Sequence, residues 1–288
     1  MIAFENVRKE YPGGTLAVQD FSLEIASRES VVLVGSSGSG KTTLMRMVNR
    51  MVEPTTGRIL IDGEDVAALD PVQLRRSIGY VMQASGLLPH RTVLDNITTV
   101  PVLRGTAKRE ARERAHELME TVGLDPELAS RYPAQLSGGQ QQRVGVARGL
   151  AADPNILLMD EPFGAVDPIV REELQSELQR LQRELRKTIV FVTHDIDEAF
   201  RIGDRVVILR PGGRIAQVGT PQEILADPAD DFVASFVGAD RGARTLHVER
   251  VDGRDVVVDA DGRAAGVLAG APAADGGREG GRGQEPPW

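Results

Sequence analysis

The chain has no cysteine, no long apolar run and no excess of positive charge. Without cysteine, disulfide bonds, thiolate metal sites and cysteine catalysis are excluded, which fits the cytosol. A run of eighteen apolar residues is missing, so the chain is not expected to span a bilayer by itself. The first residues, Met1–Asn6, lack a basic region followed by an apolar stretch, so no secretory signal is expected. The net charge of −8 argues against a non-specific nucleic-acid binder, which presents a basic face.

Short apolar runs rich in valine and isoleucine alternate with longer stretches of helical pattern. This alternation is typical of a parallel sheet covered by helices. The predicted strands of that sheet are Val31–Val34, Ile78–Met82, Ile156–Met159, Ile189–Thr193 and Val206–Leu209. Before these strands, Ile2–Val7 and Leu16–Ile25 alternate as antiparallel strands do. We therefore predict an α/β fold with a small N-terminal antiparallel β layer.

The remaining stretches define the expected domains. Residues from about 93 to 150 carry helical patterns divided by proline and glycine, which predicts an α-helical subdomain inserted into the core. In Pro168–Leu185 leucine recurs at helical spacing, as expected of core packing. The first domain, residues 1–238, is followed by a short extension, residues 239–288. In this extension Asp252–Gly253 can close a hairpin, and a disordered tail is expected from about Gly262.

The segment Gly35–Thr42, with the sequence GSSGSGKT, lies between a predicted strand and a helical pattern. Its glycines let the backbone approach phosphate oxygens, and the helix N-terminus adds the positive end of its dipole. Lys41 is expected to reach the β- and γ-phosphates and Thr42 to bind Mg²⁺. The sequence therefore predicts a P-loop NTPase core. Its expected phosphate-binding residues are Gly35, Ser36, Ser37, Gly38, Ser39, Gly40, Lys41, Thr42 and Thr43.

Two adjacent carboxylates, Asp160 and Glu161, end the predicted strand Ile156–Met159. Sites in parallel sheets form at the carboxyl ends of strands, where the P-loop also lies. Alternation along the strand turns the two carboxylates in different directions. We expect Asp160 to hold the Mg²⁺ shell and Glu161 to orient and deprotonate the attacking water.

Three further polar side chains are candidates for the same site. Gln83 follows the strand Ile78–Met82 and can reach the metal, although alone it is an ordinary loop residue. His194 ends the strand Ile189–Thr193, and a neutral imidazole there can hydrogen-bond the γ-phosphate or the water, although such a histidine is more often structural. Tyr11 precedes the P-loop, where stacking on a base and simple packing are equally expected.

A second glycine-rich motif, LSGGQ, occupies Leu136–Gln140. Ser137 and Gln140 match the S-x-x-Q capping box, which predicts that Ser137 starts a helix. The helix N-terminus offers free N–H groups to an anion, and a capped helix with no ligand is the alternative. One triphosphate does not need two such sites in one chain.

Together these residues resemble the ATP-binding subunit of an ABC transporter over about Met1–Gly238. GSSGSGKT resembles the Walker A loop, Ile156–Glu161 the Walker B strand and Leu136–Gln140 the signature motif. The other matches are Tyr11 (adenine-stacking aromatic), Gln83 (Q-loop), Gly164–Asp167 (D-loop) and His194 (switch histidine).

The resemblance implies hydrolysis of ATP with Mg²⁺ by a head-to-tail homodimer, in which the P-loop of one subunit and the signature motif of the other enclose each ATP. It implies as partners an integral-membrane permease, which the segment Gln83–Ile97 would contact, and indirectly an extracytoplasmic substrate-binding protein, but no nucleic acid. The chain would then lie at the cytoplasmic face of the membrane as a peripheral subunit. The implied catalytic residues are Glu161, His194, Lys41 and Gln83, the metal ligands Thr42, Gln83 and Asp160, and the further nucleotide contacts Tyr11, Ser137, Gly138, Gly139, Gln140 and Asp167.

Several stretches are most similar to importers of osmoprotectants such as glycine betaine, choline and proline. They are Met47–Gly57, Arg131–Pro133, Gln140–Arg148 and Phe191–Ala199. Importers of amino acids or other amines share much of this pattern and remain an alternative. A non-transport ABC ATPase is less expected, because long coiled coils and metal-binding insertions are missing. Many relatives in the osmoprotectant group continue into a pair of CBS domains, for which residues 239–288 are too short and too polar.

Overall fold

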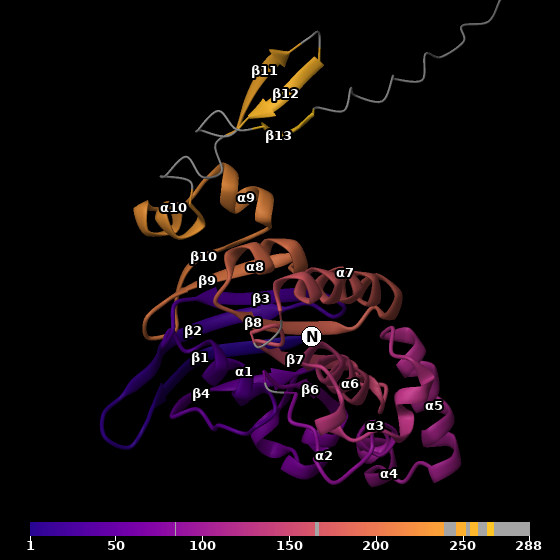
Figure 1. The fold of residues 1–288 in the computed structure, drawn as a ribbon. Helices are drawn as coiled ribbons and strands as arrows, with labels where there is room; N and C mark the ends of the chain where they lie inside the picture. Colours follow the sequence, from indigo (N-terminus) through magenta and orange to yellow (C-terminus); the bar gives the residue numbers. More distant parts are fainter. Residues whose placement is uncertain (84, 165–166, 239–245, 252–253, 259–263, 268–288) are drawn as a thin grey trace, which may run out of the picture. The chain divides into compact units, whose positions relative to one another are not determined.

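A six-stranded sheet lies at the centre of the first of two units into which the chain folds (Figure 1). The units are Met1–Val237 and Gly238–Trp288. The structure is a computed structural model that describes residues 1–83, 85–164, 167–238, 246–251, 254–258 and 264–267.

The strand order of the central sheet is β10-β9-β3-β8-β7-β6. Strands β9, β3, β8, β7 and β6 run parallel, and β10 is antiparallel to β9. The prediction of a parallel sheet is confirmed, and each of the five apolar runs forms a strand. The strands are β3 (Ser30–Gly35), β6 (Ile78–Val81), β7 (Ile156–Asp160), β8 (Thr188–Thr193), β9 (Arg205–Arg210) and β10 (Arg214–Gly219).

The predicted N-terminal layer is a four-stranded antiparallel sheet of order β2-β1-β4-β5. Its strands are β1 (Ile2–Glu10), β2 (Leu16–Ile25), β4 (Thr56–Ile61) and β5 (Glu64–Asp65). Strand β1 pairs with β2 from Ile2 opposite Ile25, and the rings of Phe4 and Phe21 meet edge to face with centroids 5.1 Å apart. This layer confirms the reading of alternating apolar residues as antiparallel strands.

Both faces of the central sheet are covered, because alternate strand residues enter different packing layers. Val31 and Leu33 of β3 belong to a core that includes Leu44 of helix α1 (Lys41–Val48) and Phe4 of β1. Val32, on the opposite face, is fully buried close to Gly203 at the end of helix α8 (Ile196–Ile202). Burial on both faces explains why these strands read as continuous apolar runs.

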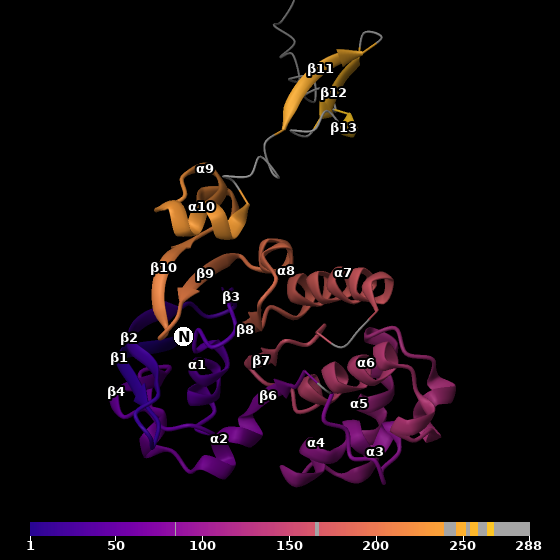
Figure 2. The same ribbon diagram turned by 60° about the vertical axis from the view of Figure 1, so that its left-hand side comes forward.

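The helices α3 to α6 gather together beyond β6 (Figure 2). They are α3 (Val93–Ile97), α4 (Thr99–Leu103), α5 (Lys108–Thr121) and α6 (Gly138–Leu150). Helix α6 packs on β6 through glycine, since a Cβ on Gly79 would lie 2.4 Å from the Gly149 carbonyl oxygen. The remaining helices are α2 (Pro71–Ser77), α7 (Pro168–Leu185), α9 (Pro221–Ala226) and α10 (Asp231–Val237) and the 3₁₀ turns Val66–Ala68, Pro126–Ser130 and Pro133–Gln135.

The second unit contains three antiparallel strands, β11 (His247–Val251), β12 (Arg254–Val258) and β13 (Ala264–Val267). The hairpin turn expected at Asp252–Gly253 lies outside the described residues, although β11 and β12 pair on either side of it. The expectation of a disordered tail from Gly262 is wrong for Ala264–Val267, because Val267 pairs with Val256 and extends the sheet. The rest of the expected tail, residues 268–288, lies outside the described residues.

Among the helices that the structure describes, none is both long and apolar enough to cross a membrane.

Candidate active site

The P-loop connects β3 to α1 and closes around the side chain of Lys41. The helix begins after Gly40, whose φ of 88° is left-handed and whose Cβ position would lie 2.5 Å from the Ala17 carbonyl oxygen, so only glycine fits there. The Lys41 Nζ donates to the carbonyl oxygens of Gly35 (2.7 Å) and Ser36 (2.9 Å). The loop therefore has the strand-loop-helix geometry that the sequence predicts.

Lys41 is a buried cation that faces two carboxylates. Burial lowers the pKa of its ammonium group, and the negative charges of Glu161 and Asp160 act in the opposite direction. The ammonium group thus lies at the carboxyl end of β7 as well as at the P-loop. An anion arriving here would meet a partly desolvated positive charge.

Asp160 ends β7 and is held on both of its carboxylate oxygens. The Thr42 hydroxyl donates to Oδ1 (2.9 Å), and the Tyr80 hydroxyl donates to Oδ2 (3.2 Å). Arg46 Nη2 lies 3.5 Å from the same Oδ2. The hydroxyl of Thr42 and the carboxylate of Asp160 are hard oxygen ligands in contact, which fits a Mg²⁺ ion that takes its other ligands from phosphate and water. Groups of three or more His, Cys, Asp or Glu side chains that could hold a metal are absent from the described residues.

Tyr80 and Arg46 are site residues that the sequence reasoning missed. Burial and the neighbouring Asp160 raise the pKa of the Tyr80 hydroxyl, and its hydrogen bond to Arg46 raises the pKa of that guanidinium. Arg46 could have been found, because it follows Thr42 by one helical turn and shares its face of α1. Tyr80 carries no such signal, since its role depends on β6 being the neighbour of β7.

Replacing Tyr80 with phenylalanine is expected to weaken Mg²⁺ binding while leaving the fold intact. The substitution removes the hydroxyl that bonds both Asp160 and Arg46. Loss of the bond to Asp160 alone, worth about 1 kcal/mol, should raise the Mg²⁺ concentration that half-saturates nucleotide binding about fivefold. The measurement is a Mg²⁺ titration of fluorescent-nucleotide binding. Tyr132→Phe is the control, because that side chain is 46% exposed. An unchanged Mg²⁺ dependence in Tyr80→Phe would show that the hydroxyl does not orient Asp160.

Glu161 brings together the other predicted catalytic side chains. Its Oε2 lies 3.1 Å from His194 Nδ1 at the end of β8 and accepts a hydrogen bond from Gln83 Nε2 (3.5 Å) after β6. The Glu161 backbone N–H donates to the Val192 carbonyl oxygen (2.9 Å) and the residue has a φ of 44°. Non-glycine residues adopt this left-handed conformation at a cost of about 1 kcal/mol or more, and such strain is common at functional sites.

Tyr11 and Asp167 are the two remaining predicted nucleotide contacts outside the two glycine-rich motifs. Tyr11 follows β1, its N–H donates to the Thr15 carbonyl oxygen (2.9 Å), and the Lys9 ammonium lies 5.1 Å from its ring centroid. Asp167 directly precedes α7, where its carbonyl oxygen accepts from the Arg171 N–H (2.8 Å). The neighbouring D-loop residues Ala165 and Val166 lie outside the described residues. The proposed nucleotide contacts of Tyr11 and Asp167 therefore stay predictions.

The signature motif forms the start of α6, as its capping box predicts. Ser137 Oγ accepts from the Gln140 N–H (3.2 Å), and Gln140 Oε1 accepts from the Ser137 N–H (2.9 Å). Ser137 and Gly138 are exposed, whereas Gly139 is buried. Within the described part of the chain, no hydrogen bond or ion pair joins Ser137–Gln140 to the P-loop. The structure thus gathers the P-loop, Asp160, Glu161, Gln83 and His194, but it does not bring the signature motif to them.

Comparison with known proteins finds, over most of the chain, the family that the sequence motifs resemble. The family model described as ABC transporter matches residues 18–164. The choline transport ATP-binding protein OpuBA of Bacillus subtilis (strain 168) is 54% identical over 88% of this chain, which spans 66% of that relative. The glycine betaine uptake system ATP-binding protein YehX of Escherichia coli (strain K12) is 48% identical over 87% of this chain and 81% of its own length.

Solved structures agree with these relatives. The ATP-binding cassette MJ0796 in a dimeric post-hydrolysis state bound to ADP and Pi superimposes with a TM-score of 0.70 at 36% identity, over 77% of this chain and 99% of that one. The P-loop, the paired carboxylates, the capped signature helix and these similarities lead to one conclusion. The chain belongs to the ABC transporter family.

Proposed function

We propose that this chain is the ATP-binding and ATP-hydrolysing subunit of an importer for a quaternary amine or related osmoprotectant, such as glycine betaine, choline or proline. The observation that carries the proposal is the 54% identity to a choline transport ATP-binding protein over 88% of the chain. A glycine betaine/carnitine/choline transport ATP-binding protein of Bacillus subtilis (strain 168) is also 54% identical, over 253 residues. An importer for amino acids or other amines is the alternative, and a non-transport ABC ATPase is supported by none of these relatives.

The contacts among these side chains support the roles that we propose for them. The P-loop amides and Lys41 would hold the phosphates, and Thr42, Asp160 and Gln83 would hold Mg²⁺. The metal, when bound, neutralises charge that develops on the phosphate oxygens. Glu161 would accept the proton of the attacking water, and His194, whose Nδ1 lies 3.1 Å from Glu161 Oε2, would orient that carboxylate.

A homodimer accounts for the separation of the two glycine-rich motifs. The exposed start of α6 offers free N–H groups, and we propose that it closes on the ATP held by the P-loop of a second copy of the chain. Ser137, Gly138, Gly139 and Gln140 would contact that ATP, with Asp167 at the same interface and Tyr11 on the adenine. The dimeric post-hydrolysis state of the similar cassette MJ0796 supports this arrangement.

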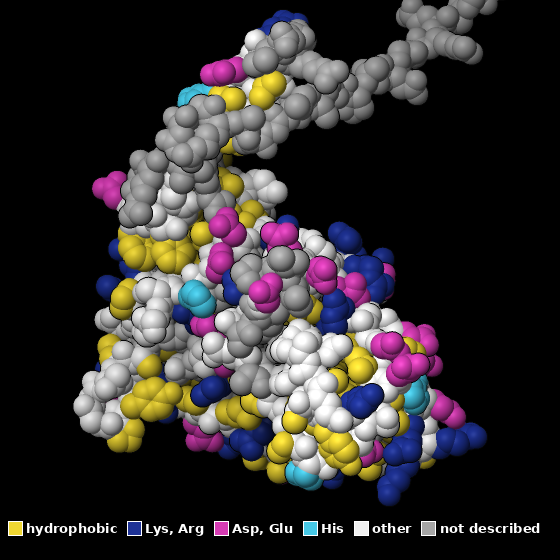
Figure 3. All heavy atoms as spheres, in the orientation of Figure 1, with side chains coloured by type: hydrophobic (Ala, Val, Ile, Leu, Met, Phe, Trp, Pro, Cys, Tyr) yellow, Lys and Arg dark blue, Asp and Glu magenta, His cyan; other side chains and the backbone are white. Residues whose placement is uncertain are grey.

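The permease is proposed to contact the segment Gln83–Ile97 and the groove beside it. Buried Asn96 fixes this segment, because its side chain accepts from the Leu88 N–H (2.7 Å) and donates to the carbonyl oxygens of Leu88, Arg91 and Thr92. Hydrophobic, basic and acidic side chains lie together over the helices α3 to α5 (Figure 3). A fixed surface of this composition suits a permease that transmits movement through it.

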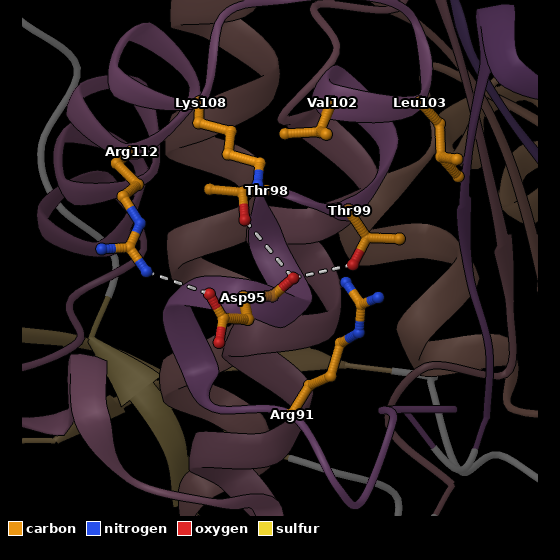
Figure 4. Close-up of a pocket in the computed structure, with 8 residues that line it drawn as sticks. All are labelled: Arg91, Asp95, Thr98, Thr99, Val102, Leu103, Lys108 and Arg112. Atoms are coloured by element: carbon orange, nitrogen blue, oxygen red, sulfur yellow. Dashed lines mark hydrogen bonds and ion pairs between the residues drawn. The ribbon is translucent and has the colours of Figure 1, made fainter.

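The groove itself has a volume of about 540 Å³ (Figure 4). On one side Asp95 pairs with Arg112 (3.2 Å), and its carbonyl oxygen accepts from the Thr99 hydroxyl (2.7 Å). The exposed side chain of Leu103 adds an apolar contact. The lining residues are Arg91, Asp95, Thr98, Thr99, Val102, Leu103, Lys108 and Arg112.

The test is to reconstitute the chain with its permease and binding protein in liposomes and to measure ATP hydrolysis with candidate substrates. Glycine betaine, choline or proline should stimulate hydrolysis several-fold, because bound substrate favours the closed dimer of ATPase subunits. The Lys41→Ala complex is the control for contaminating ATPases. Stimulation by amino acids or polyamines alone would replace the osmoprotectant with another substrate class, and co-purification with ribosomes or DNA would contradict transport.

A further inference from the structure

Arg148, on the signature helix α6, holds the backbone of the loop that follows Gln83. Its Nη1 donates to the Gly86 carbonyl oxygen and its Nη2 to the Ser85 carbonyl oxygen, both at 2.7 Å. Two parallel bonds from one planar guanidinium fix both the distance and the direction of the loop. This part of the loop is therefore attached to α6 by a side chain sixty-two residues further along the chain.

The loop needs such support because its backbone conformation is unfavourable. Ser85 has a φ of 55° and is 4% exposed, and Gly86 follows with a φ of 56°. Serine in the left-handed region costs about 1 kcal/mol or more, so surrounding contacts must hold it there. The backbone of α6 supplies a second contact, since a Cβ on Gly145 would lie 3.7 Å from Ser85 Cβ.

Arg148 carries a charge at a position where packing alone would favour an apolar residue. Burial lowers the pKa of its guanidinium, and within the described part of the chain its bonds go to backbone carbonyl oxygens and not to a carboxylate. A half-buried cation without a carboxylate costs free energy that an apolar residue of similar size would avoid. The contribution of Arg148 to the structure therefore lies in its two hydrogen bonds to the loop carbonyls.

We propose that Arg148 is a positioning residue for Gln83, which makes the position of Gln83 beside Glu161 depend on the position of the signature helix. The proposal rests on the function proposed above. Ser85 lies two residues after Gln83, whose side chain donates to Glu161, and α6 begins at the Ser137 cap. A shift of α6 when Ser137 engages the second subunit is thereby passed to the catalytic carboxylate through two hydrogen bonds.

The first test is a double-mutant cycle on ATP hydrolysis with Arg148→Lys and Gln83→Ala. Lysine keeps the charge but cannot bond both carbonyls in parallel, so kcat should fall about tenfold with an unchanged KM for ATP. In the Gln83→Ala background the same change should cost less than about twofold, because the residue through which it acts is gone. An equal tenfold loss in both backgrounds would overturn the proposal. Arg143→Lys is the matched control, since Arg143 also donates from α6 to a backbone carbonyl, that of Val122.

The second test is rescue by a disulfide, for which a chain without cysteine is well suited. The 3.7 Å between the Cβ positions of residues 85 and 145 matches the spacing of disulfide-bonded cysteines, so Ser85→Cys with Gly145→Cys should form a bond. In the Arg148→Lys background the oxidised protein should regain kcat to within about twofold of the Arg148 protein with the same disulfide, and reduction should remove the gain. If wild type hydrolyses ATP but the oxidised Arg148→Lys protein does not regain kcat, the positioning role of Arg148 is overturned and the proposed function stands. Absence of hydrolysis in wild type overturns the proposed function together with it.

Discussion

Glu161→Gln should bind ATP as wild type does but hydrolyse it at least about 10² times more slowly, which is the usual contribution of a general base. Glutamine has the shape of glutamate and can keep the contacts with His194 (3.1 Å) and Gln83 (3.5 Å), but its amide cannot accept the proton of the attacking water. Lys41, the P-loop and Asp160 are untouched, so binding should remain. ATP should then hold two subunits together instead of being consumed.

The measurement combines fluorescent-nucleotide binding, single-turnover hydrolysis and size-exclusion chromatography with ATP and Mg²⁺. Wild type should elute mainly as a monomer after turnover, whereas Glu161→Gln should elute as a dimer. Glu172→Gln, an exposed carboxylate on α7, is the matched control and should behave as wild type. Normal turnover in Glu161→Gln would remove Glu161 from the role of base, and loss of ATP binding would show that its charge serves the fold of the site.

The core of the site was predictable because its parts are local in the sequence. The P-loop is one continuous segment whose glycines and helix start can be read directly, and Lys41 and Thr42 follow from their places in it. Asp160 and Glu161 end an apolar run, and strands buried on both faces give continuous runs of valine and isoleucine. Parallel strands bring their carboxyl ends to one edge, which is why Gln83 and His194 meet Glu161.

The contacts that the sequence did not reveal join residues far apart in the chain. Tyr80 reaches Asp160 only because β6 lies beside β7, and Arg148 reaches Ser85 only because α6 packs on the loop. The strand β13 is a similar case, since Ala264–Val267 has little strand character of its own and is ordered by pairing with β12. Such contacts depend on how distant segments pack in the folded chain. A single sequence indicates that packing only where it resembles a family of known fold.

Two kinds of mixed dimer should give opposite results if the signature motif acts on the ATP of the other subunit. In the first dimer, Lys41→Ala lies in one subunit and Ser137→Asp in the other. Both defects then fall on one composite site, and the other site keeps an intact P-loop and an intact signature motif. In the second dimer both substitutions lie in one subunit and its partner is wild type, so each composite site has one defect. The first dimer should retain one working site and the second none.

The two substitutions are chosen so that the fold survives. Aspartate is as good a helix cap as serine, so α6 should still start at residue 137, but its charge opposes a phosphate there by several kcal/mol, or about a hundredfold or more in affinity. Lys41→Ala removes the ammonium that the loop encloses and keeps the glycines at positions 35 and 40, where a Cβ would clash with backbone oxygens. Each substitution alone, made in both subunits, should abolish the ATP-stabilised dimer.

Differently tagged subunits carrying Glu161→Gln allow the trapped nucleotide to be counted after double affinity purification. One ATP per dimer in the first combination and none in the second would establish sites shared between subunits, since each motif then acts only with its counterpart in the other chain. The reverse result, a single ATP in the second combination alone, would mean that Ser137 and Lys41 serve the same nucleotide within one chain. In that case α6 would have to move to its own P-loop, to which no hydrogen bond or ion pair connects it in the described structure. The count of bound ATP therefore tests directly whether the two motifs of one site come from two subunits.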